Sequence, residues 1–460
     1  MLANIKSLSK KFYITFFCII GLFVCSAFNE YCTYILVAGC CLITPFLSIQ
    51  ETLELMLFCY PFQIIFKTQH IDNLYLLMTF VFTGILAVKY LIEIIKRQKR
   101  INFKVLIPIL IFLIYLLLPI HDVTVQNYGR YCFTYLLVYL VIIYRKELNF
   151  TKLSLAFCLG IIISSLLSVL KFVSPLLDGK ILESVSYSGS NYIKFTGLDV
   201  HPNSLTTSVI IAMSALFVCK YQNKIKDVYF VVLFALLFIV GYATISRAFI
   251  IGTGALLVLF YILYFIKYKK KAIPLLIITA VVFCALLLIM YRETREYLCR
   301  LFEINNQVAV EVDKTIEENW NEIRNGTINY DPGRIGIYKM YLKDIFSSVS
   351  IFLFGRGISA SYLGGVACHN TFLQLLWFHG LFGYCIYLAI LFSVIKFSKK
   401  AFKQNVLKIL LFLIPIFLPL LFESSLIIQE LFIFIFALTL SYDDNEGSAK
   451  SLKSENMVVN

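Results

Sequence analysis

The sequence of 460 residues is 60% hydrophobic, with a mean hydropathy of +0.83 and a formal net charge of +14 at pH 7. Soluble globular domains are nearer half apolar, so this composition excludes an ordinary soluble protein and indicates a chain embedded in lipid. The positive charge gathers in short loops between apolar runs, which argues against a nucleic-acid-binding protein and is typical of cytoplasmic loops in membrane proteins.

The apolar runs predict membrane-spanning helices, because they are continuous rather than alternating and are long enough to approach the ~30 Å of a bilayer core. The first run follows a short basic start, but no small-residue cleavage site follows it, so we take it as a span rather than a signal peptide. We expect about 12–14 spans. The candidate spans are residues 12–28, 31–48, 51–66, 73–95, 104–120, 131–144, 153–174, 203–219, 228–243, 247–267, 272–291, 370–395, 406–421 and 425–441.

Two pairs of candidate spans, within residues 31–66 and 406–441, are short and contain prolines. Proline removes a backbone donor and breaks the helical ladder. Each pair is therefore either two spans or a kinked or re-entrant element. The prolines concerned are Pro45, Pro61, Pro415 and Pro419.

The basic loops predict the orientation of the chain, because lysine and arginine accumulate on the cytoplasmic side. Every second loop is basic, which puts both termini in the cytoplasm and the intervening loops outside. The basic loops are residues 96–100, 145–146, 220–226, 267–271 and 396–408.

This pattern divides the chain into five segments. We expect N-terminal spans, a second group of spans, one large extracytoplasmic loop with short helices, C-terminal spans and a disordered cytoplasmic tail. Their bounds are 1–190, 191–291, 292–369, 370–441 and 442–460.

The large outer loop has an ordered pattern. Residues 311–324 have helix-forming composition, and a turn at 331–333 precedes a second helix that starts at Arg334. One face of that helix either packs on the bundle or lies at the membrane interface. This face contains Ile335, Tyr338, Tyr341, Leu342, Ile345 and Phe346.

Glycines and cysteines mark the end of the same loop. Residues 355–357 (Gly-Arg-Gly) and 364–365 (Gly-Gly) predict tight backbone just before His369. Cys299 and Cys368 bracket the loop and are either a disulfide pair or free thiols, since the loop is expected outside the cytoplasm.

Several arginines lie on the expected outer side, against the usual charge bias. Arg247 is the clearest case, because only a short polar hinge separates the spans around it. Either it clamps phosphate or pyrophosphate, or it snorkels or pairs with a carboxylate such as Glu423. The outer arginines are Arg130, Arg247, Arg292, Arg295, Arg300, Arg324, Arg334 and Arg356.

Of the five histidines, His369 stands out because it opens an apolar span together with Asn370. Such a histidine is a base, a metal ligand or a hydrogen-bonding residue. No HExxH motif or close histidine–carboxylate pair occurs, so we predict no metal site. His201 precedes Pro202, which suits the first turn of a helix, and a helix-start role competes with a role at a site. His379, deeper in the span, is interpreted as structural.

Other reaction classes lack their motifs. The sequence has no P-loop for nucleotide hydrolysis and no GxSxG nucleophile elbow. It also has no acidic DxD-like pair in a cytoplasmic domain, which would indicate a nucleotide-sugar donor. Any sugar donor should therefore be lipid-linked and presented on the outer side.

Three motifs, within residues 195–395, carry a resemblance to a known family. They are residues 244–247 (TISR), residues 333–334 (GR), and residues 355–357 (GRG) followed by 369–373 (HNTFL) and 380–383 (GLFG). In these motifs the chain resembles the O-antigen ligase and polymerase family of bacterial polysaccharide enzymes (Wzy C-terminal or WaaL-like). It departs from the family at residues 378–380, where such proteins often have an acidic residue before the glycine. Residues 1–190 match only in hydropathy.

The resemblance implies an all-α polytopic, GT-C-like fold and an inverting, metal-independent glycosyltransferase without a cofactor, acting on the outer face of the bacterial cytoplasmic membrane. The donor would be a glycan on undecaprenyl pyrophosphate. By carry-over, Arg247 and Arg334 bind the pyrophosphate, and His369 is the general base or orients the acceptor. Candidate substrate-binding residues are Arg356, Arg130, His201 and Asn370.

The resemblance leaves more than one function open. We favour a polymerase, which joins one lipid-linked repeat unit to another. The alternatives are a ligase, which transfers the glycan to lipid A core or a protein, and a polysaccharide flippase or other transporter. Expected partners are the lipid-linked oligosaccharide and the bilayer, with a chain-length regulator and a flippase as further candidates.

Overall fold

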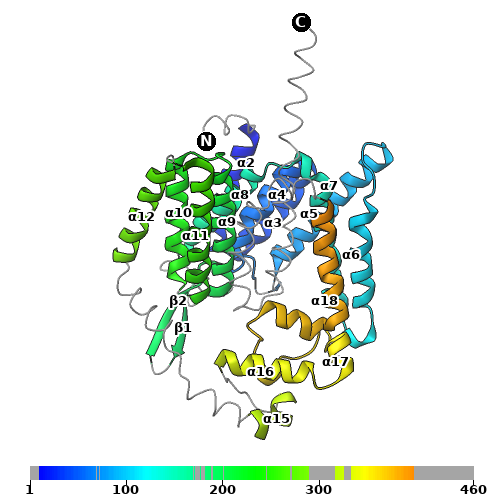
Figure 1. Cartoon of the computed structure of the whole chain (residues 1–460). Coiled ribbons are helices and arrows are strands. Elements are labelled where there is room, and N and C mark those ends of the chain that lie inside the picture. The colour runs from blue at the N-terminus through cyan, green and yellow to red at the C-terminus, as the bar shows by residue number, and fades with distance from the viewer. Residues whose placement is uncertain are drawn as a thin grey trace. The chain divides into compact units, whose positions relative to one another are not determined.

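The structure is a computed structural model that describes residues 10–289, 316–325 and 333–397 (Figure 1). Within the first range it leaves out 69, 72, 169, 171–176, 178–181, 188–189, 200, 245 and 270–271. The expected spans 406–421 and 425–441, the tail 442–460, Cys299 and Glu423 lie outside the described residues. The described elements form two compact units, and each is considered by itself.

Unit 1 contains the N-terminal helices and the helices after residue 147. Its elements are α2 (Lys10–Ser26), α3 (Glu30–Ile43), η1 (Thr44–Phe46), α4 (Ile49–Cys59), η2 (Tyr60–Phe62), α5 (Leu74–Ile95), α8 (Phe150–Leu167), β1 (Leu182–Tyr187), β2 (Ser190–Phe195), α9 (Pro202–Tyr221), α10 (Asp227–Ala243), α11 (Arg247–Tyr268) and α12 (Ala272–Ile289).

Unit 2 contains the last residues of α5, the next two helices and the segment around the large loop. Its elements are α6 (Phe103–Leu116), η3 (Pro119–His121), α7 (Val125–Tyr144), α15 (Trp320–Arg324), α16 (Gly333–Ile345), α17 (Val349–Phe354), η7 (Leu363–Gly365) and α18 (Thr371–Phe397). A short 3-10 turn, η4 (Arg145–Glu147), lies at the boundary between the units.

The helical membrane character predicted from the sequence is present. In the described part of the chain, five helices are long and apolar enough to cross a membrane. Further apolar helices are shorter, among them α6 and α10. The five are Leu74–Ile95, Phe150–Leu167, Pro202–Tyr221, Ala248–Tyr268 and Thr371–Ile390.

Helix α9 forms the centre of unit 1. It packs against α8, α10 and α11, and its side chains are buried from Leu205 to Tyr221. A helix that is buried all round needs no polar face, and α9 accordingly has apolar residues on every side, interspersed with small hydroxyl residues. The hydroxyl of Thr206 donates to the carbonyl of Pro202 at 2.9 Å, so its burial leaves no unsatisfied donor.

The second element of the proline-interrupted pair within residues 31–66 lies along most of α5. Helix α4 alone, with 11 residues, is only about 16 Å long. Residues 47–66, which contain α4 and η2, nevertheless reach both ends of α5. At one end Lys89 Nζ donates to the carbonyl of Leu47 at 2.6 Å. At the other end the amide of Leu74 donates to the carbonyl of Phe66 at 3.0 Å. This arrangement supports the kinked span over the re-entrant element.

A small hairpin is the one departure from an all-helical chain among the described residues. Strands β1 and β2 pair antiparallel, with Val185 opposite Tyr192 and Tyr187 opposite Ser190. β-branched and aromatic residues favour extended backbone, which the hydropathy pattern does not report. The hairpin lies between the expected spans 153–174 and 203–219.

The first prediction concerns the contact between α4 and α8. A Cβ added at Gly160 would lie 2.4 Å from the carbonyl oxygen of Phe58, whereas one added at Gly254 would meet nothing within 4 Å. We expect Gly160→Ala to lower the unfolding free energy by about 1–3 kcal/mol through overpacking. Gly254→Ala should be neutral or stabilising, because alanine favours helices.

Thermal unfolding of the full-length protein in detergent measures both changes. A Gly160→Ala variant as stable as wild type would show that α4 and α8 do not approach each other this closely.

Candidate active site

The predicted site residues of unit 1, His201 and Arg247, lie where α9 and α11 begin. The hydroxyl oxygens of Thr206 and Thr244 lie 2.7 Å apart in a buried hydrogen bond that either residue can donate, and Thr244 Oγ1 also lies 2.6 Å from the carbonyl oxygen of Gly241. Thr206 is in the first turns of α9, and Thr244 lies just before Arg247, the first residue of α11. The hydrogen bond therefore joins the start of α9, which follows His201, to the turn between α10 and α11, which precedes Arg247.

His201 has the helix-start role that Pro202 suggested. Its Nδ1 accepts a hydrogen bond from the amide of Asn203 at 3.2 Å, and Pro202 occupies the first position of α9. The imidazole is exposed. Its contact with a substrate stays a prediction.

In unit 2, helix α16 binds the segment that leads to His369. The hydroxyl of Tyr338 donates to the carbonyl of His369 at 3.1 Å, and that of Tyr341 donates to the carbonyl of Val366 at 2.8 Å. Residues three apart on a helix lie on nearly the same side. The two tyrosines therefore bind successive parts of the irregular segment that ends at His369. Burial raises the pKa of Tyr341 well above its usual value, so its hydroxyl stays a donor.

The next residue in this series, Asp344, is fully buried and charged. Its carboxylate accepts from Nε and Nη2 of Arg356, at 2.8 and 2.5 Å, and from the indole Nε1 of Trp377 at 2.9 Å. Nε of Arg324 lies 3.7 Å away. A buried carboxylate is costly unless it is paired and hydrogen-bonded, and here a two-nitrogen guanidinium contact and an indole satisfy it.

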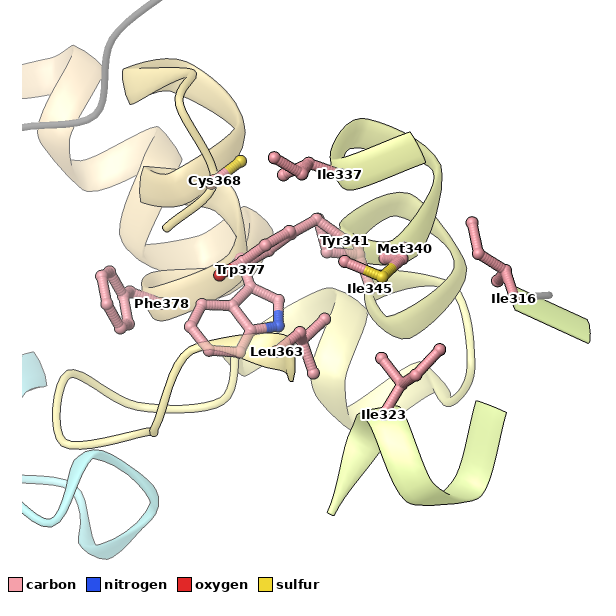
Figure 2. Close-up of a cluster of buried hydrophobic side chains, with 10 residues drawn as sticks. All are labelled: Ile316, Ile323, Ile337, Met340, Tyr341, Ile345, Leu363, Cys368, Trp377 and Phe378. Atoms are coloured by element: carbon pink, nitrogen blue, oxygen red, sulfur yellow. The ribbon is translucent and has the colours of Figure 1, made fainter. Parts of the chain in front are cut away.

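An apolar cluster surrounds this ion pair. Figure 2 shows Trp377 between the ring of Tyr341 and Leu363, with Cys368 facing Ile337. The Tyr341 and Trp377 rings meet edge-on, with centroids 4.9 Å apart. Their burial excludes water from the carboxylate, which strengthens its interactions. The cluster consists of Ile316, Ile323, Ile337, Met340, Tyr341, Ile345, Leu363, Cys368, Trp377 and Phe378.

Glycines let the loop and α18 touch backbone to backbone. The amides of Arg356 and Gly357 donate to the carbonyls of Trp377 and Phe378, at 2.8 and 3.0 Å. Gly355 and Gly357 have φ values of +81° and +88°, as the predicted tight backbone requires. A Cβ on Gly355 would lie 2.3 Å from the carbonyl oxygen of Phe378.

Helix α18 is broken at Gly380, where we expected one continuous span over 370–395. Gly380 has φ +61° and ψ −173°, and Figure 1 shows α18 changing direction sharply along its length. The break has a tertiary cause, because a Cβ at Gly380 would lie 2.4 Å from the amide nitrogen of Gly355. The hydroxyl of Tyr115 donates to the carbonyl of His379 at 2.6 Å and so satisfies a group that the break exposes.

His369 occupies a left-handed backbone conformation, with φ +50°, immediately before α18. Asn370 then caps the helix: its Oδ1 accepts from the amide of Leu373 at 3.0 Å. Both side chains are half-buried. The structure thus gives Asn370 a capping role, and its contact with a substrate stays a prediction.

The remaining predicted arginines fall into three situations. Arg334 is the second residue of α16, one turn before Tyr338, and its side chain is not described. The guanidinium of Arg356 is held by Asp344 and is 27% exposed, which gives it a structural role. Arg130 is half-buried in the second turn of α7. Substrate contacts of all three stay predictions.

The expected apolar face of α16 is only partly right. Tyr341 and Ile345 are buried, but Ile335, Leu342 and Phe346 are exposed. The buried side is centred on Asp344, since Arg356 and Trp377 bind it there, and this rotates the helix away from the orientation that hydrophobicity alone predicts.

Two further histidines lie deep in unit 2. His121 and His379 are 0% and 1% exposed, with ring centroids 5.9 Å apart, and the Tyr115 ring lies 4.7 Å from that of His121. His379 is buried, in accord with a structural role. Burial lowers the pKa of His121 to about 4, so its imidazole is neutral at pH 7.

Four residues that hold the site together were not predicted from the sequence to do so: Tyr338, Tyr341, Asp344 and Trp377. One signal was present: Asp344 is an acidic residue at helical spacing from apolar positions, and a carboxylate on such a face needs a cationic partner. No group of three or more metal-ligating side chains gathers within the described ranges.

Comparison with known proteins adds no assignment. No protein-family model matches the chain, and no curated protein matches it.

We predict that the carboxylate of Asp344 is a main stabilising group of unit 2. Asp344→Ala leaves the Arg356 guanidinium and the Trp377 N–H without their acceptor, and it should lower the unfolding free energy by about 3–5 kcal/mol. Glu317→Ala, at an exposed position of the same unit, should change it by less than about 0.5 kcal/mol.

Chemical or thermal unfolding in detergent measures both variants. The double variant Asp344→Leu/Arg356→Met should recover part of the loss, because it removes both charges together. Equal stabilities of Asp344→Ala and Glu317→Ala would refute the pairing.

We also predict acid sensitivity from His121. Its folded-state pKa of about 4 lies below the unfolded value of 6.5, so the unfolded state binds the proton more readily. The contribution of neutral His121 to the unfolding free energy is fully present above pH 6.5. It is lost as the pH falls towards 4, by up to about 1.4 kcal/mol per pH unit.

Unfolding measured between pH 8 and pH 4 tests this, because His121→Phe should flatten the curve below pH 6.5. His70→Phe, at an exposed histidine, should leave the curve as in wild type. Identical curves for wild type and His121→Phe would disprove the effect.

Proposed function

We propose that the protein is a bacterial surface-polysaccharide polymerase of GT-C-like fold. It transfers a glycan from undecaprenyl pyrophosphate to a hydroxyl of a second lipid-linked repeat unit on the outer face of the cytoplasmic membrane. The proposal combines the motif resemblance with the chemistry of the residues gathered around His369.

In the proposed reaction, the acceptor oxygen attacks the anomeric carbon while the bond from that carbon to the pyrophosphate oxygen breaks. The proton of the acceptor hydroxyl passes to the imidazole of His369, or His369 orients the acceptor. The two cationic residues Arg247 and Arg334 neutralise the departing pyrophosphate, which makes it a better leaving group. Attack opposite the leaving group inverts the anomeric centre.

One observation carries most of the proposal. Tyr338 donates to the backbone of His369 and lies one turn after Arg334 on α16. Residues four apart on a helix are neighbours on its surface. A predicted base and a predicted pyrophosphate ligand therefore belong to directly connected parts of unit 2.

Unit 1 contributes a second, independent observation. The Thr206–Thr244 hydrogen bond holds together the helix starts beside His201 and Arg247. Arg247 is the first residue of α11, and the start of a helix favours an anionic ligand. This suits a pyrophosphate group.

The test is the glycan chain-length profile of cells that lack this gene, complemented with wild type, Arg247→Ala or His369→Ala. Single repeat units with both variants and long chains with wild type are expected of a polymerase. Arg97→Ala and His70→Ala, at exposed positions, serve as matched controls and should restore long chains.

Two other results would change the assignment. Long chains that stay on the lipid carrier and are missing from their acceptor would identify a ligase. Unchanged surface polymer in the deletion strain would overturn the proposal. Lipid-linked units that accumulate on the cytoplasmic side in the deletion strain would instead identify a flippase.

A further inference from the structure

His369 has a backbone conformation that few residues adopt. Its φ of +50° places it in the left-handed region, where side chains other than glycine are uncommon, although histidine is found there more often than most. Such a conformation is unfavourable by itself and persists only where the surroundings fix it. The direction of the imidazole depends on this backbone, because the side chain leaves from its Cα.

Two sets of contacts fix the conformation. On the C-terminal side, Asn370 caps α18 and its carbonyl accepts from the amide of Gln374 at 2.9 Å. On the other side, the hydroxyl of Tyr338 binds the His369 carbonyl directly, and Tyr341 holds the carbonyl of Val366 three residues earlier.

Helix α16 can act in this way because it is itself anchored. Asp344, six residues after Tyr338, is joined to Trp377 of α18 and to Arg356 of the loop. The position of Tyr338 relative to α18 is therefore set by a buried ion pair rather than by surface contacts. A hydroxyl on so rigid a support can impose a geometry on the chain that it binds.

We propose that Tyr338 is a positioning residue for the reaction: its hydroxyl holds the His369 backbone in the left-handed conformation and thereby aims the imidazole at the acceptor. This inference rests on the proposed function. It assigns Tyr338 no contact with substrate.

The test compares Tyr338→Phe with wild type, using full-length protein in lipid nanodiscs and a lipid-linked oligosaccharide as donor and acceptor. Loss of the hydroxyl should lower kcat about 10- to 100-fold, since misplacement by about 1 Å is enough for such a loss. KM for the donor and the unfolding temperature should stay as in wild type.

A matched control is Tyr268→Phe, because the Tyr268 hydroxyl also donates to a backbone carbonyl, that of Tyr221 at 2.9 Å, in unit 1. This variant should retain full kcat. In a His369→Ala background, Tyr338→Phe should cause no further loss of activity. An equal further loss in that background would overturn the inference, because Tyr338 would then act independently of His369.

A second measurement separates this inference from the proposed function. This measurement is the NMR signal of the His369 backbone carbonyl in protein that carries 13C-carbonyl-labelled histidine. The signal is assigned by its loss in His369→Ala. It should shift in Tyr338→Phe but not in Tyr268→Phe. An unchanged signal would overturn the inference whatever the activity. A shifted signal together with a fully active His369→Ala variant would leave the contact standing and reject the catalytic role.

Discussion

The burial of one carboxylate organises the loop-bearing part of this protein. Asp344 has no exposed surface, and its charge is tolerated because Arg356 and Trp377 donate to it. These three residues come from a helix, a glycine-flanked turn and the next helix. Each segment is too short or too irregular to keep its position alone. The ion pair therefore fixes how the three segments assemble. The surrounding apolar cluster excludes water and so strengthens the ion pair.

Contacts extend from this ion pair to His369, the residue that we propose as the base. Two tyrosines that precede Asp344 on α16 donate to the backbone carbonyls of Val366 and His369, and glycines permit the turn to lie directly on α18. Unit 1 uses a different device, a hydrogen bond between two threonine hydroxyls, to fix the helix starts near Arg247. In both units polar contacts among otherwise apolar helices set the positions of the residues that we propose to act on substrate.

Hydropathy predicted where most described helices lie, because long apolar runs have few alternatives in a membrane. Thus α5, α9 and α11 lie within a few residues of their expected bounds. The break at Gly380 was not predictable, since a lone glycine in an apolar run is compatible with a helix and only the contact with Gly355 reveals its purpose. Likewise, the motif led us to predict His369 as a site residue, but its left-handed backbone and the hydroxyl that binds its carbonyl could not be predicted, because Tyr338 is about 30 residues away in the sequence.

The Tyr115 contacts have a consequence for exchanging parts between related proteins. The hydroxyl oxygen of this α6 residue lies 3.1 and 2.6 Å from the carbonyl oxygens of Phe354 and His379, and so joins α6 to the two segments that meet at Gly355 and Gly380. A chimera that replaces only residues 333–397 would take the acceptor carbonyls from one parent protein and the Tyr115 hydroxyl from the other. The smallest transplantable cassette therefore includes α6, although more than two hundred residues of sequence separate it from its partners.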